Sequence, residues 1–489
     1  MKRFLGILLT AALLFSAIVP AFAAPAAEPF SELENDGLPI ILVRGMDGDA
    51  LTVDPGDGTS RLALEIDTEE LTSALFKAFK AGLFGMSADK AVDELIAYAN
   101  DVCKYIACDK TGRPVYDTTI QTYPLALSEY PAMLDGSEGF SESNIARSAA
   151  EVYGAERTYY FAYDWRENPL DVSDDLAEMV DRALLESGKD KVNIVCASLG
   201  GTETVAYLTE YGYEKVNSCV FVSSAFSGIY LASDMLSGRI TVDGDVLANY
   251  VLYSMQDNAV GSFFVKALKS VGVFNLLARF TNSFIDKNLD KVAEGFLRDN
   301  LGYIPSFWAL VLPEDYEEAV STVFGDDLEG NAEFIAITEE LHQMVLGRDE
   351  LLRAAAADGV HIAVIAGYNK PSAPGYARST EQGDGTLDTA LMSGGATVAP
   401  YGKTLGDDYV AADASKLSPD RVIDASACLF PDATWFVKDS PHVGCRYGSE
   451  YADFLFWLVS AEGQPTVNDS PLYPQFMRTD SEQNLFPLQ

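Results

Sequence analysis

The chain has 489 residues, of which 48% are hydrophobic and 22% are charged. It is longer than one ordinary domain and apolar enough to bury a large core, which excludes an intrinsically disordered protein. Asp and Glu outnumber Lys and Arg by 73 to 34, and the resulting net charge of −39 excludes nucleic acid as a general partner.

The N-terminus has the pattern of a secretory signal peptide. Two basic residues precede an apolar run over residues 4–19, and Ala21-Phe22-Ala23 provides the small residues that a cleavage site requires. We predict cleavage after Ala23, which removes residues 1–23 and leaves a secreted mature chain. The apolar run is short for a membrane span, and no later stretch is longer, so we expect no transmembrane segment in the mature chain. The alternative is that this run stays in place as an uncleaved anchor.

Six short apolar runs recur along the chain, and helical patterns lie between them. The runs span residues 39–43, 159–163, 192–196, 219–222, 362–366 and 434–437. Because these runs are apolar throughout, they suit strands that are buried on both faces of a parallel sheet. Amphipathic patterns at residues 170–187 and 201–211 indicate helices between the strands. The sequence therefore predicts an α/β fold with a mostly parallel central sheet flanked by helices.

Two segments depart from this alternation. Residues 227–357 are mainly helical in pattern, and we interpret them as a cap or lid inserted into a core that comprises residues 24–226 and 358–462. Residues 463–489 are rich in Pro, Asn, Asp and Gln, which predicts an extended C-terminal tail. The cap carries apolar residues that would suit an acyl-binding wall, although ordinary helix core explains most of them better: Phe263, Phe264, Phe274, Leu276, Leu277 and Phe280.

The chain contains six cysteines. Because export permits disulfides, Cys103–Cys108 and Cys428–Cys445 are plausible pairs, but spacing does not determine connectivity. The remaining two, Cys196 and Cys219, lie in apolar runs and are expected to be buried thiols. No CxxC pair or histidine cluster indicates a metal site, and no cofactor is expected.

The strongest candidate for a nucleophile is a serine that follows a buried strand. Cys196-Ala197-Ser198-Leu199-Gly200-Gly201 leads from that strand into a helix, which is the setting of a nucleophile elbow. The turn needs small residues on either side of Ser198, and Gly200 meets that need, whereas Cys196 stands where glycine is usual. The alternative is a serine that only caps the helix.

A nucleophile of this kind needs two backbone N–H groups to stabilise an oxyanion. Leu199, directly after the serine, is one candidate donor. The other normally lies in the loop after an early strand, and the segment Arg44-Gly45-Met46-Asp47-Gly48 makes Met46 the second candidate. An ordinary glycine-rich loop is the alternative for this segment.

The chain has only three histidines, so the choice of a general base is narrow. His342 lies in a helical pattern of the cap, and His361 begins an apolar strand. His442 follows the last predicted strand in Asp439-Ser440-Pro441-His442 and precedes a helix, which is the loop position that a base requires. The alternative for His442 is an ordinary surface histidine.

The acid is assigned by its place in the chain. Gly383-Asp384-Gly385-Thr386 lies between the predicted strand at 362–366 and His442, so Asp384 can orient the base. The same four residue types recur at positions 56–59, before the nucleophile, where they indicate an ordinary turn. Rival acids are Asp388, Asp424 and Asp439.

Taken together, these motifs resemble the lecithin:cholesterol acyltransferase-like and lipase branch of the α/β-hydrolase superfamily. The resemblance rests on Tyr163-Asp164-Trp165-Arg166, on the elbow at Ser198, on Pro305-Ser306 with Trp308 and Leu312-Pro313 in the cap, and on the Asp384 loop. It covers residues 38–226 and 358–460. Two positions depart from the family pattern, Cys196 and Arg44, where His or Pro usually precedes the loop glycine. From the residues alone, Asp164 and Arg166 also suit a buried ion pair.

The resemblance implies a serine hydrolase or O-acyltransferase that acts on lipid acyl esters, with Ser198 as nucleophile, His442 as base and Asp384 as acid. Its partners would be a small-molecule or lipid ester and, transiently, a lipid interface. The two departures also fit a non-catalytic binding protein on the same scaffold. The sequence does not choose between hydrolase and acyltransferase, nor does it identify the substrate.

Overall fold

The computed structural model describes residues 37–46, 51–56, 58–64, 96–97, 99–135, 143–256, 259–446 and 449–489. The predicted signal peptide, residues 1–23, lies outside the described residues, as does Asp57 of the repeated tetrapeptide. The side chain of Phe280 is likewise not described.

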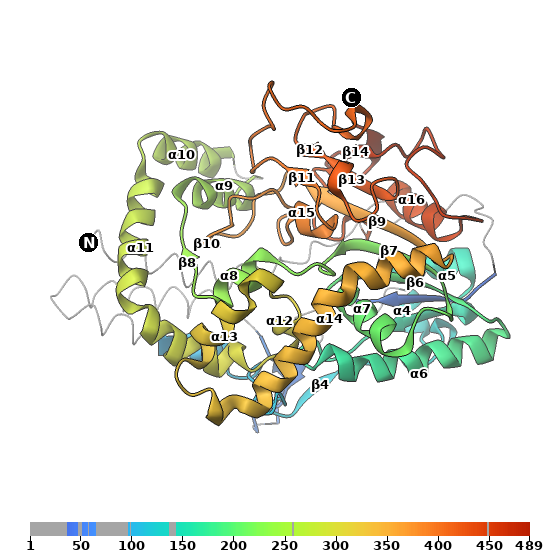
Figure 1. Ribbon diagram of the computed structural model, residues 1–489, viewed down its shortest axis with the longest axis horizontal. Helices are drawn as coiled ribbons and strands as arrows, with labels where there is room; N and C mark the ends of the chain where they lie inside the picture. Colours follow the sequence, from blue (N-terminus) through green and yellow to red (C-terminus); the bar gives the residue numbers. More distant parts are fainter. Residues whose placement is uncertain are drawn as a thin grey trace.

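The described residues form one large central sheet (Figure 1). Its strands run in the order β15-β14-β13-β9-β7-β6-β1-β5, and every neighbouring pair is parallel except β14 with β15. In chain order the strands are β1 (Ile40–Val43), β5 (Thr158–Phe161), β6 (Val192–Ser198), β7 (Val216–Ser224), β9 (His361–Tyr368), β13 (Thr434–Lys438), β14 (Phe476–Thr479) and β15 (Leu485–Pro487). All six predicted strands are present, which confirms the α/β fold class.

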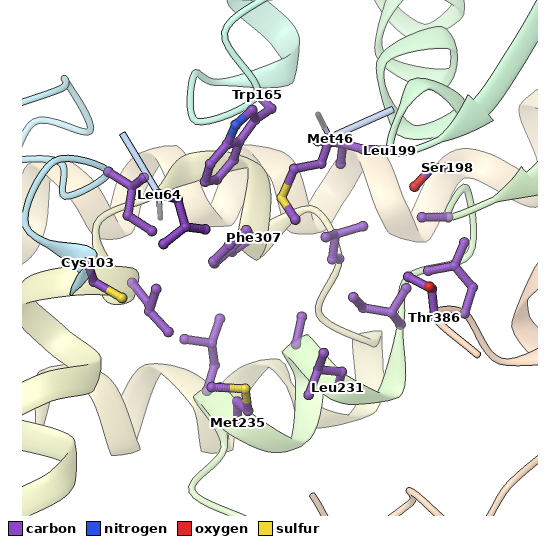
Figure 2. Close-up of a pocket in the computed structure, with 18 of the residues that line it drawn as sticks. Met46, Leu64, Cys103, Trp165, Ser198, Leu199, Leu231, Met235, Phe307 and Thr386 are labelled. Carbon is purple, nitrogen blue, oxygen red and sulfur yellow. The ribbon is translucent and has the colours of Figure 1, made fainter. Parts of the chain in front are cut away.

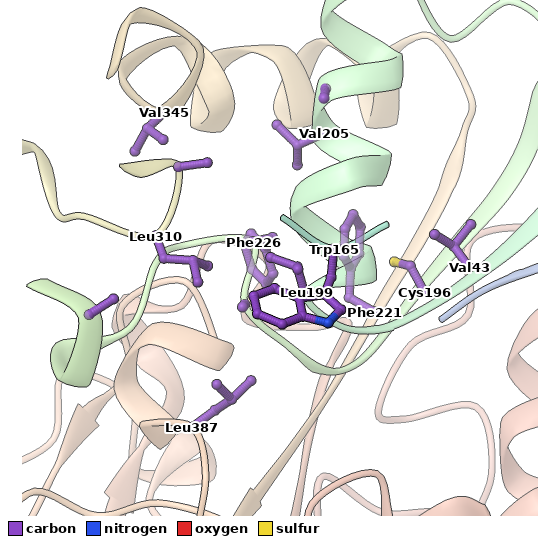
Figure 3. Close-up of a cluster of buried hydrophobic side chains, with 14 of the residues drawn as sticks. Val43, Trp165, Cys196, Leu199, Val205, Phe221, Phe226, Leu310, Val345 and Leu387 are labelled. Carbon is purple, nitrogen blue, oxygen red and sulfur yellow. The ribbon is translucent and has the colours of Figure 1, made fainter. Parts of the chain in front are cut away.

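Helices cover both faces of this sheet, because alternate side chains of each strand point to opposite sides. On one face Ile194 and Phe221 belong to a core that includes side chains of α6 (Pro169–Ser187), α7 (Gly200–Tyr211) and α14 (Ala332–Ala357) (Figure 3). On the other face Val195 and Val220 pack in a second core with α5 (Ser143–Tyr153) and α16 (Ser449–Val459). The predicted helices at 170–187 and 201–211 correspond to α6 and α7.

Local signals explain where α6 begins and ends. Asn168 caps its start by accepting a hydrogen bond from the Leu170 amide at 3.1 Å, and Pro169 follows at the first helical position. Gly188 ends the helix with φ 66°, a left-handed conformation that glycine adopts without strain. The helix therefore spans the whole predicted range and begins one residue earlier.

Residues 227–357 form a mainly helical layer, although its last helix, α14, packs on the face of the central sheet beside α7. Its helices are α8 (Tyr230–Leu236), α9 (Gly244–Ser254), α10 (Ala259–Ser270), α11 (Val273–Val292), the π-helical η4 (Ala293–Gly302), α12 (Pro305–Trp308), α13 (Tyr316–Phe324) and α14. One short strand, β8 (Ile240–Thr241), pairs with β10 (Gly375–Tyr376) outside this layer. In Figure 1, α9, α10 and α11 lie to one side, away from the central sheet.

Smaller elements surround the sheet. A three-stranded sheet consists of β2 (Leu51–Val53), β3 (Arg61–Leu62) and β4 (Thr118–Ile120), and β11 (Thr397–Val398) pairs with β12 (Ile423–Asp424). Short helices among the described residues include α4 (Pro131–Leu134) and α15 (Thr389–Met392).

The prediction of an extended tail over residues 463–489 is wrong. This segment adds β14 and β15 to the edge of the central sheet, with Phe436 aligned to Phe476 in the parallel pair. The phenyl rings of these two residues stack at 5.7 Å, and Met477 is fully buried. The polar composition of the segment describes its loops, whereas the few apolar residues between them form the strands.

The two disulfide pairs considered above are absent as well. All six cysteines lie within the described residues, and each is a buried thiol that forms no disulfide bond. Cys428 belongs to the core on one face of the sheet and Cys445 to the core on the other, so the sheet separates them. Cys103 and Cys108 share one core without bonding. Burial raises the pKa of Cys103 to about 12, so its thiol is neutral.

The docking of the C-terminal strands yields a stability prediction. We expect Phe476→Ala to lower the free energy of unfolding by about 3–5 kcal/mol, because the ring is buried against the sheet. Phe486→Ala, in the neighbouring strand, is the matched control, since that ring is 38% exposed and should cost much less. Denaturant unfolding of both variants checks this, and equal losses would contradict the role given to β14.

Candidate active site

Ser198 occupies a strained turn at the carboxyl end of β6. Its φ of 54° is in the left-handed region, which non-glycine residues rarely adopt, and α7 begins two residues later. A Cβ atom on Gly200 would lie 2.4 Å from the Val43 carbonyl oxygen, so only glycine allows α7 to approach β1 this closely. The segment therefore has the strand–turn–helix geometry of a nucleophile elbow.

The departure at Cys196 is accommodated inside the strand. Its side chain points into the core on the α6–α7 side of the sheet and is fully buried. The thiol lies 3.6 Å from the Val220 carbonyl oxygen, to which it donates. Cysteine is thus compatible with the turn, because the tight contact falls on Gly200.

The departure at Arg44 has a structural explanation too. Its guanidinium is buried and donates from Nη2 to the Tyr163 carbonyl at 2.8 Å, while the Tyr163 hydroxyl donates to the Arg44 carbonyl at 2.9 Å. This reciprocal pair fixes the start of the loop after β1. Gly45 follows, and a Cβ there would lie 2.5 Å from the Cβ of Ser198.

Both candidate oxyanion donors lie beside the serine. Met46 and Leu199 line the same cavity as Ser198 (Figure 2). Within the described residues, neither the Met46 amide nor the Leu199 amide donates a hydrogen bond. Both can therefore donate to an oxygen atom of a ligand.

The structure brings Asp384 and His442 together. Nδ1 of His442 lies 2.8 Å from Oδ2 of Asp384, whose side chain is fully buried. The other oxygen, Oδ1, accepts hydrogen bonds from the Thr386 and Leu387 amides at 2.9 and 2.8 Å. These bonds fix the carboxylate, which holds the imidazole through Nδ1. Among the described side chains, no hydrogen bond joins His442 to Ser198.

The loop that carries His442 is attached next to the strand of Ser198. The Val443 amide donates to Oγ of Ser223 at 3.1 Å, and Ser224 is the register partner of Ser198 across β6 and β7. Ser223 and Val443 both have positive φ, at 43° and 50°. Ser223 is a positioning residue that sequence reasoning missed, because a serine inside a buried strand carries no motif.

The other titratable candidates are engaged elsewhere. Asp424 accepts from the Ser426 amide and the Tyr409 hydroxyl, and Asp439 accepts from the Asn369 amide group. His342 stacks on Tyr316 in the cap, and His361 lies at the start of β9, the end of the strand opposite to the site.

Asp388 is a buried neighbour of Asp384. Its Oδ2 accepts from the Tyr230 amide at 2.9 Å. Burial raises the pKa of Asp388 to about 7, and the negative charge of Asp384 contributes in the same direction. Asp388 thus bonds the start of α8 rather than the imidazole.

An apolar cavity of about 180 Å³ opens at Ser198. In Figure 2 it extends from Ser198 and Thr386 at one end to Cys103 and Leu64 at the other, past Trp165 and Phe307. The lining residues are Met46, Leu64, Cys103, Ile106, Trp165, Ser198, Leu199, Ala225, Ile229, Leu231, Ala232, Met235, Leu236, Phe296, Leu301, Phe307, Leu310, Thr386 and Leu387. Apart from Ser198, Cys103 and Thr386, every one of these residues is apolar.

The cap forms part of this wall, though with different residues from those considered above. Leu231 and Met235 of α8, Phe296 of η4 and Phe307 of α12 line the cavity. The side chains of Phe263 and Phe264 are instead exposed, and Phe274 packs in a separate small core. Helical periodicity predicts helices in this segment but not which of their faces meet the cavity.

The Asp164-Trp165-Arg166 motif positions part of the cavity wall. Arg166 is fully buried and binds Asp164 through two hydrogen bonds, Nε to Oδ1 at 2.9 Å and Nη2 to Oδ2 at 2.6 Å. Trp165 lies between the two residues of this ion pair in the sequence. Its indole ring stacks on the ring of Phe307, with 5.8 Å between the ring centroids. The ion pair is therefore structural and serves to place Trp165.

Comparison with known proteins supports the fold. The family described as alpha/beta hydrolase fold matches residues 139–256, which include β5, α6, β6, Ser198, α7 and β7. With the mostly parallel sheet, this match establishes the α/β-hydrolase fold for the chain. The match ends before Asp384 and His442.

The remaining comparisons add little. A solved structure titled "The crystal structure of Tle4-Tli4 complex" is 13% identical, with 68% of this chain and 75% of that chain covered, at a TM-score of 0.26. So distant a likeness carries no functional argument. No curated protein matches the chain. Within the described residues, no group of three or more His, Cys, Asp or Glu side chains is arranged to hold a metal ion.

Substitutions of the two buried aspartates, Asp384 and Asp388, should have different effects on kcat. We expect Asp384→Asn to lower kcat on an ester by about 10³–10⁴-fold, because the amide stabilises the wrong imidazole tautomer. Asp388→Asn is the matched control and should stay within about tenfold, since the amide oxygen still accepts from Tyr230. Steady-state kinetics of the folded variants decide between the two, and an inverted order would move the acid to Asp388.

Proposed function

We propose that this protein is a secreted serine hydrolase that acts on carboxylic esters with a long apolar acyl chain. The observation that carries the proposal is the buried Asp384–His442 pair next to an apolar cavity that opens at Ser198. A buried carboxylate bonded to Nδ1 of a loop histidine orients and polarises the ring as a general base requires. The predicted signal peptide supports export.

The chemistry would proceed through an acyl-enzyme. Ser198 attacks the ester carbonyl carbon, and Nε2 of His442 takes the hydroxyl proton. The negative charge on the carbonyl oxygen is stabilised by the Met46 and Leu199 amides, and the alcohol leaves with the proton from His442. Water, or an acceptor alcohol in an acyltransferase, then attacks the acyl group with His442 again as base. No cofactor takes part.

The cavity supports an apolar acyl group rather than a polar one. Beyond Ser198 and Thr386, the lining side chains offer only the indole N–H of Trp165 and the weak thiol of Cys103 as hydrogen-bond donors. A polar substrate would lose most of its hydrogen bonds to water there, whereas each buried methylene contributes about 0.8 kcal/mol. This selects esters of lipid type, such as glycerolipids or simple fatty esters.

Covalent labelling tests the enzyme claim directly. A fluorophosphonate probe should label the wild-type protein at one serine, and Ser198→Ala should abolish the labelling because it removes the nucleophile. Ser227→Ala is the control, since this nearby hydroxyl has no partner among the described residues and should be dispensable. An unlabelled wild-type protein would favour the non-catalytic binding protein instead. Product analysis with and without an acceptor alcohol separates hydrolase from acyltransferase.

The far end of the cavity predicts a chain-length limit. Cys103→Phe should fill the space next to Leu64 and lower kcat/KM for a palmitoyl ester by at least about tenfold, because several methylenes lose their contacts. A butyryl ester ends before this point, so its hydrolysis should change little. Cys103→Ala, which enlarges the same end, should retain the long substrate. Parallel losses on both esters in Cys103→Phe would show that the acyl chain lies elsewhere.

A further inference from the structure

Exposed apolar side chains gather at one corner of the cap. We define this α10–α11 corner as residues 259–285. It contains five large hydrophobic side chains that are between 43% and 74% exposed: Phe263, Phe264, Leu268, Val271 and Leu276. Monomeric proteins normally scatter such residues singly, whereas a cluster of them marks an interaction surface.

The corner has its own small apolar core, on which α10 and α11 pack. Val265, Phe274 and Ala278 are buried against Leu247 and Ala248 of α9. The side chains of the patch point away from this core. In Figure 1, α10 and α11 lie at the edge of the molecule, away from the sheet.

The corner has a positive net charge, whereas the net charge of the whole chain is negative. Residues 259–285 contain three cations, Lys266, Lys269 and Arg279, and no Asp or Glu, although acidic residues outnumber basic ones by more than two to one overall. Lys269 binds Asn249 at 2.7 Å and lies 3.6 Å from Asp245. Lys266 and Arg279 are exposed and have no ion-pair partner among the described side chains.

The shape of the corner suits the plane of a membrane surface. Within the described residues no single helix is long and apolar enough to cross a membrane. Only Gly261–Ser270 and Val273–Leu289 together have that composition, and a 68° bend separates them. Exposed phenylalanines next to unpaired cations are typical of helices that lie in the headgroup region.

We propose that the α10–α11 corner docks the protein on an anionic phospholipid membrane. The apolar side chains enter the boundary between headgroups and acyl chains, and Lys266 and Arg279 meet the lipid phosphates. The remaining surface, being strongly acidic, is repelled, so only this corner approaches the bilayer. The proposal goes beyond the proposed ester hydrolysis, because it concerns a surface distinct from the Ser198 cavity.

Vesicle co-sedimentation tests the proposal without any turnover. Wild-type protein should bind phosphatidylcholine vesicles that contain phosphatidylglycerol more tightly than pure phosphatidylcholine vesicles, and less tightly as salt rises. Phe263→Ser/Phe264→Ser should lower the partition coefficient by at least about tenfold, because two large apolar groups no longer enter the interface. The matched control is Leu185→Ser/Val410→Ser, which removes two even more exposed apolar side chains elsewhere and should bind like wild type.

Substitution of the two cations tests the electrostatic part of the proposed membrane binding. Lys266→Gln and Arg279→Gln should each lower binding to the anionic vesicles by roughly fivefold and leave binding to pure phosphatidylcholine unchanged. Circular dichroism and thermal unfolding confirm that each variant is folded.

Three results would overturn the proposal: no binding of wild-type protein to anionic vesicles, equal binding by the phenylalanine and control variants, or self-association that Phe263→Ser/Phe264→Ser abolishes. The last would assign the corner to a second copy of this chain. Because binding is measured without substrate, a protein that binds vesicles but lacks esterase activity, or the reverse, separates this proposal from the proposed function.

Discussion

The tight contact between the start of α7 and the end of β1 is the constraint on which the site depends. The two elements can approach this closely because Gly200 has no side chain. The backbone strain of the turn lies at Ser198, which has a positive φ. The contact places the Leu199 amide beside the loop of Met46, so the serine and both candidate donors share one location. Such strain persists only where the surrounding structure determines it. Here the buried strands on both sides of β6 provide that rigidity.

The remaining parts of the site are attached to neighbouring strands by backbone hydrogen bonds. The Ala225 amide donates to the Ser198 carbonyl at 2.8 Å, and Ser223, two residues earlier, accepts from the loop of His442. Asp384 packs against the end of β9. A Cβ added to Gly367 in this strand would lie 2.8 Å from the Cβ of Asp384. Each polar group thus depends on a rigid strand end, which limits the reorganisation needed during a reaction.

Sequence patterns predicted the sheet because its strands are buried on both faces and are therefore apolar throughout. The same logic failed for β14 and β15, which lie at the edge, are short and are separated by polar loops, so their composition resembles a tail. Chain order selected Asp384 over its rivals, and its bond to His442 agrees with that choice. Ser223 and the cavity-facing residues of the cap were not predictable, because contacts between distant segments decide them. Neither motif nor helical period encodes such contacts.

A buried ionic network determines how the cap relates to the acid loop. Asp234 of α8 is fully buried and pairs with Arg239 at 2.9 Å and Arg378 at 2.7 Å, and both arginines also bind Asp315. Moving α8 alone would leave a buried carboxylate unpaired, which costs several kcal/mol. Because Tyr230 at the start of α8 also donates to Asp388, the cavity wall and the acid loop form one unit. The α10–α11 corner lies outside this network, so contacts made at that corner need not disturb the alignment of Asp384 with His442.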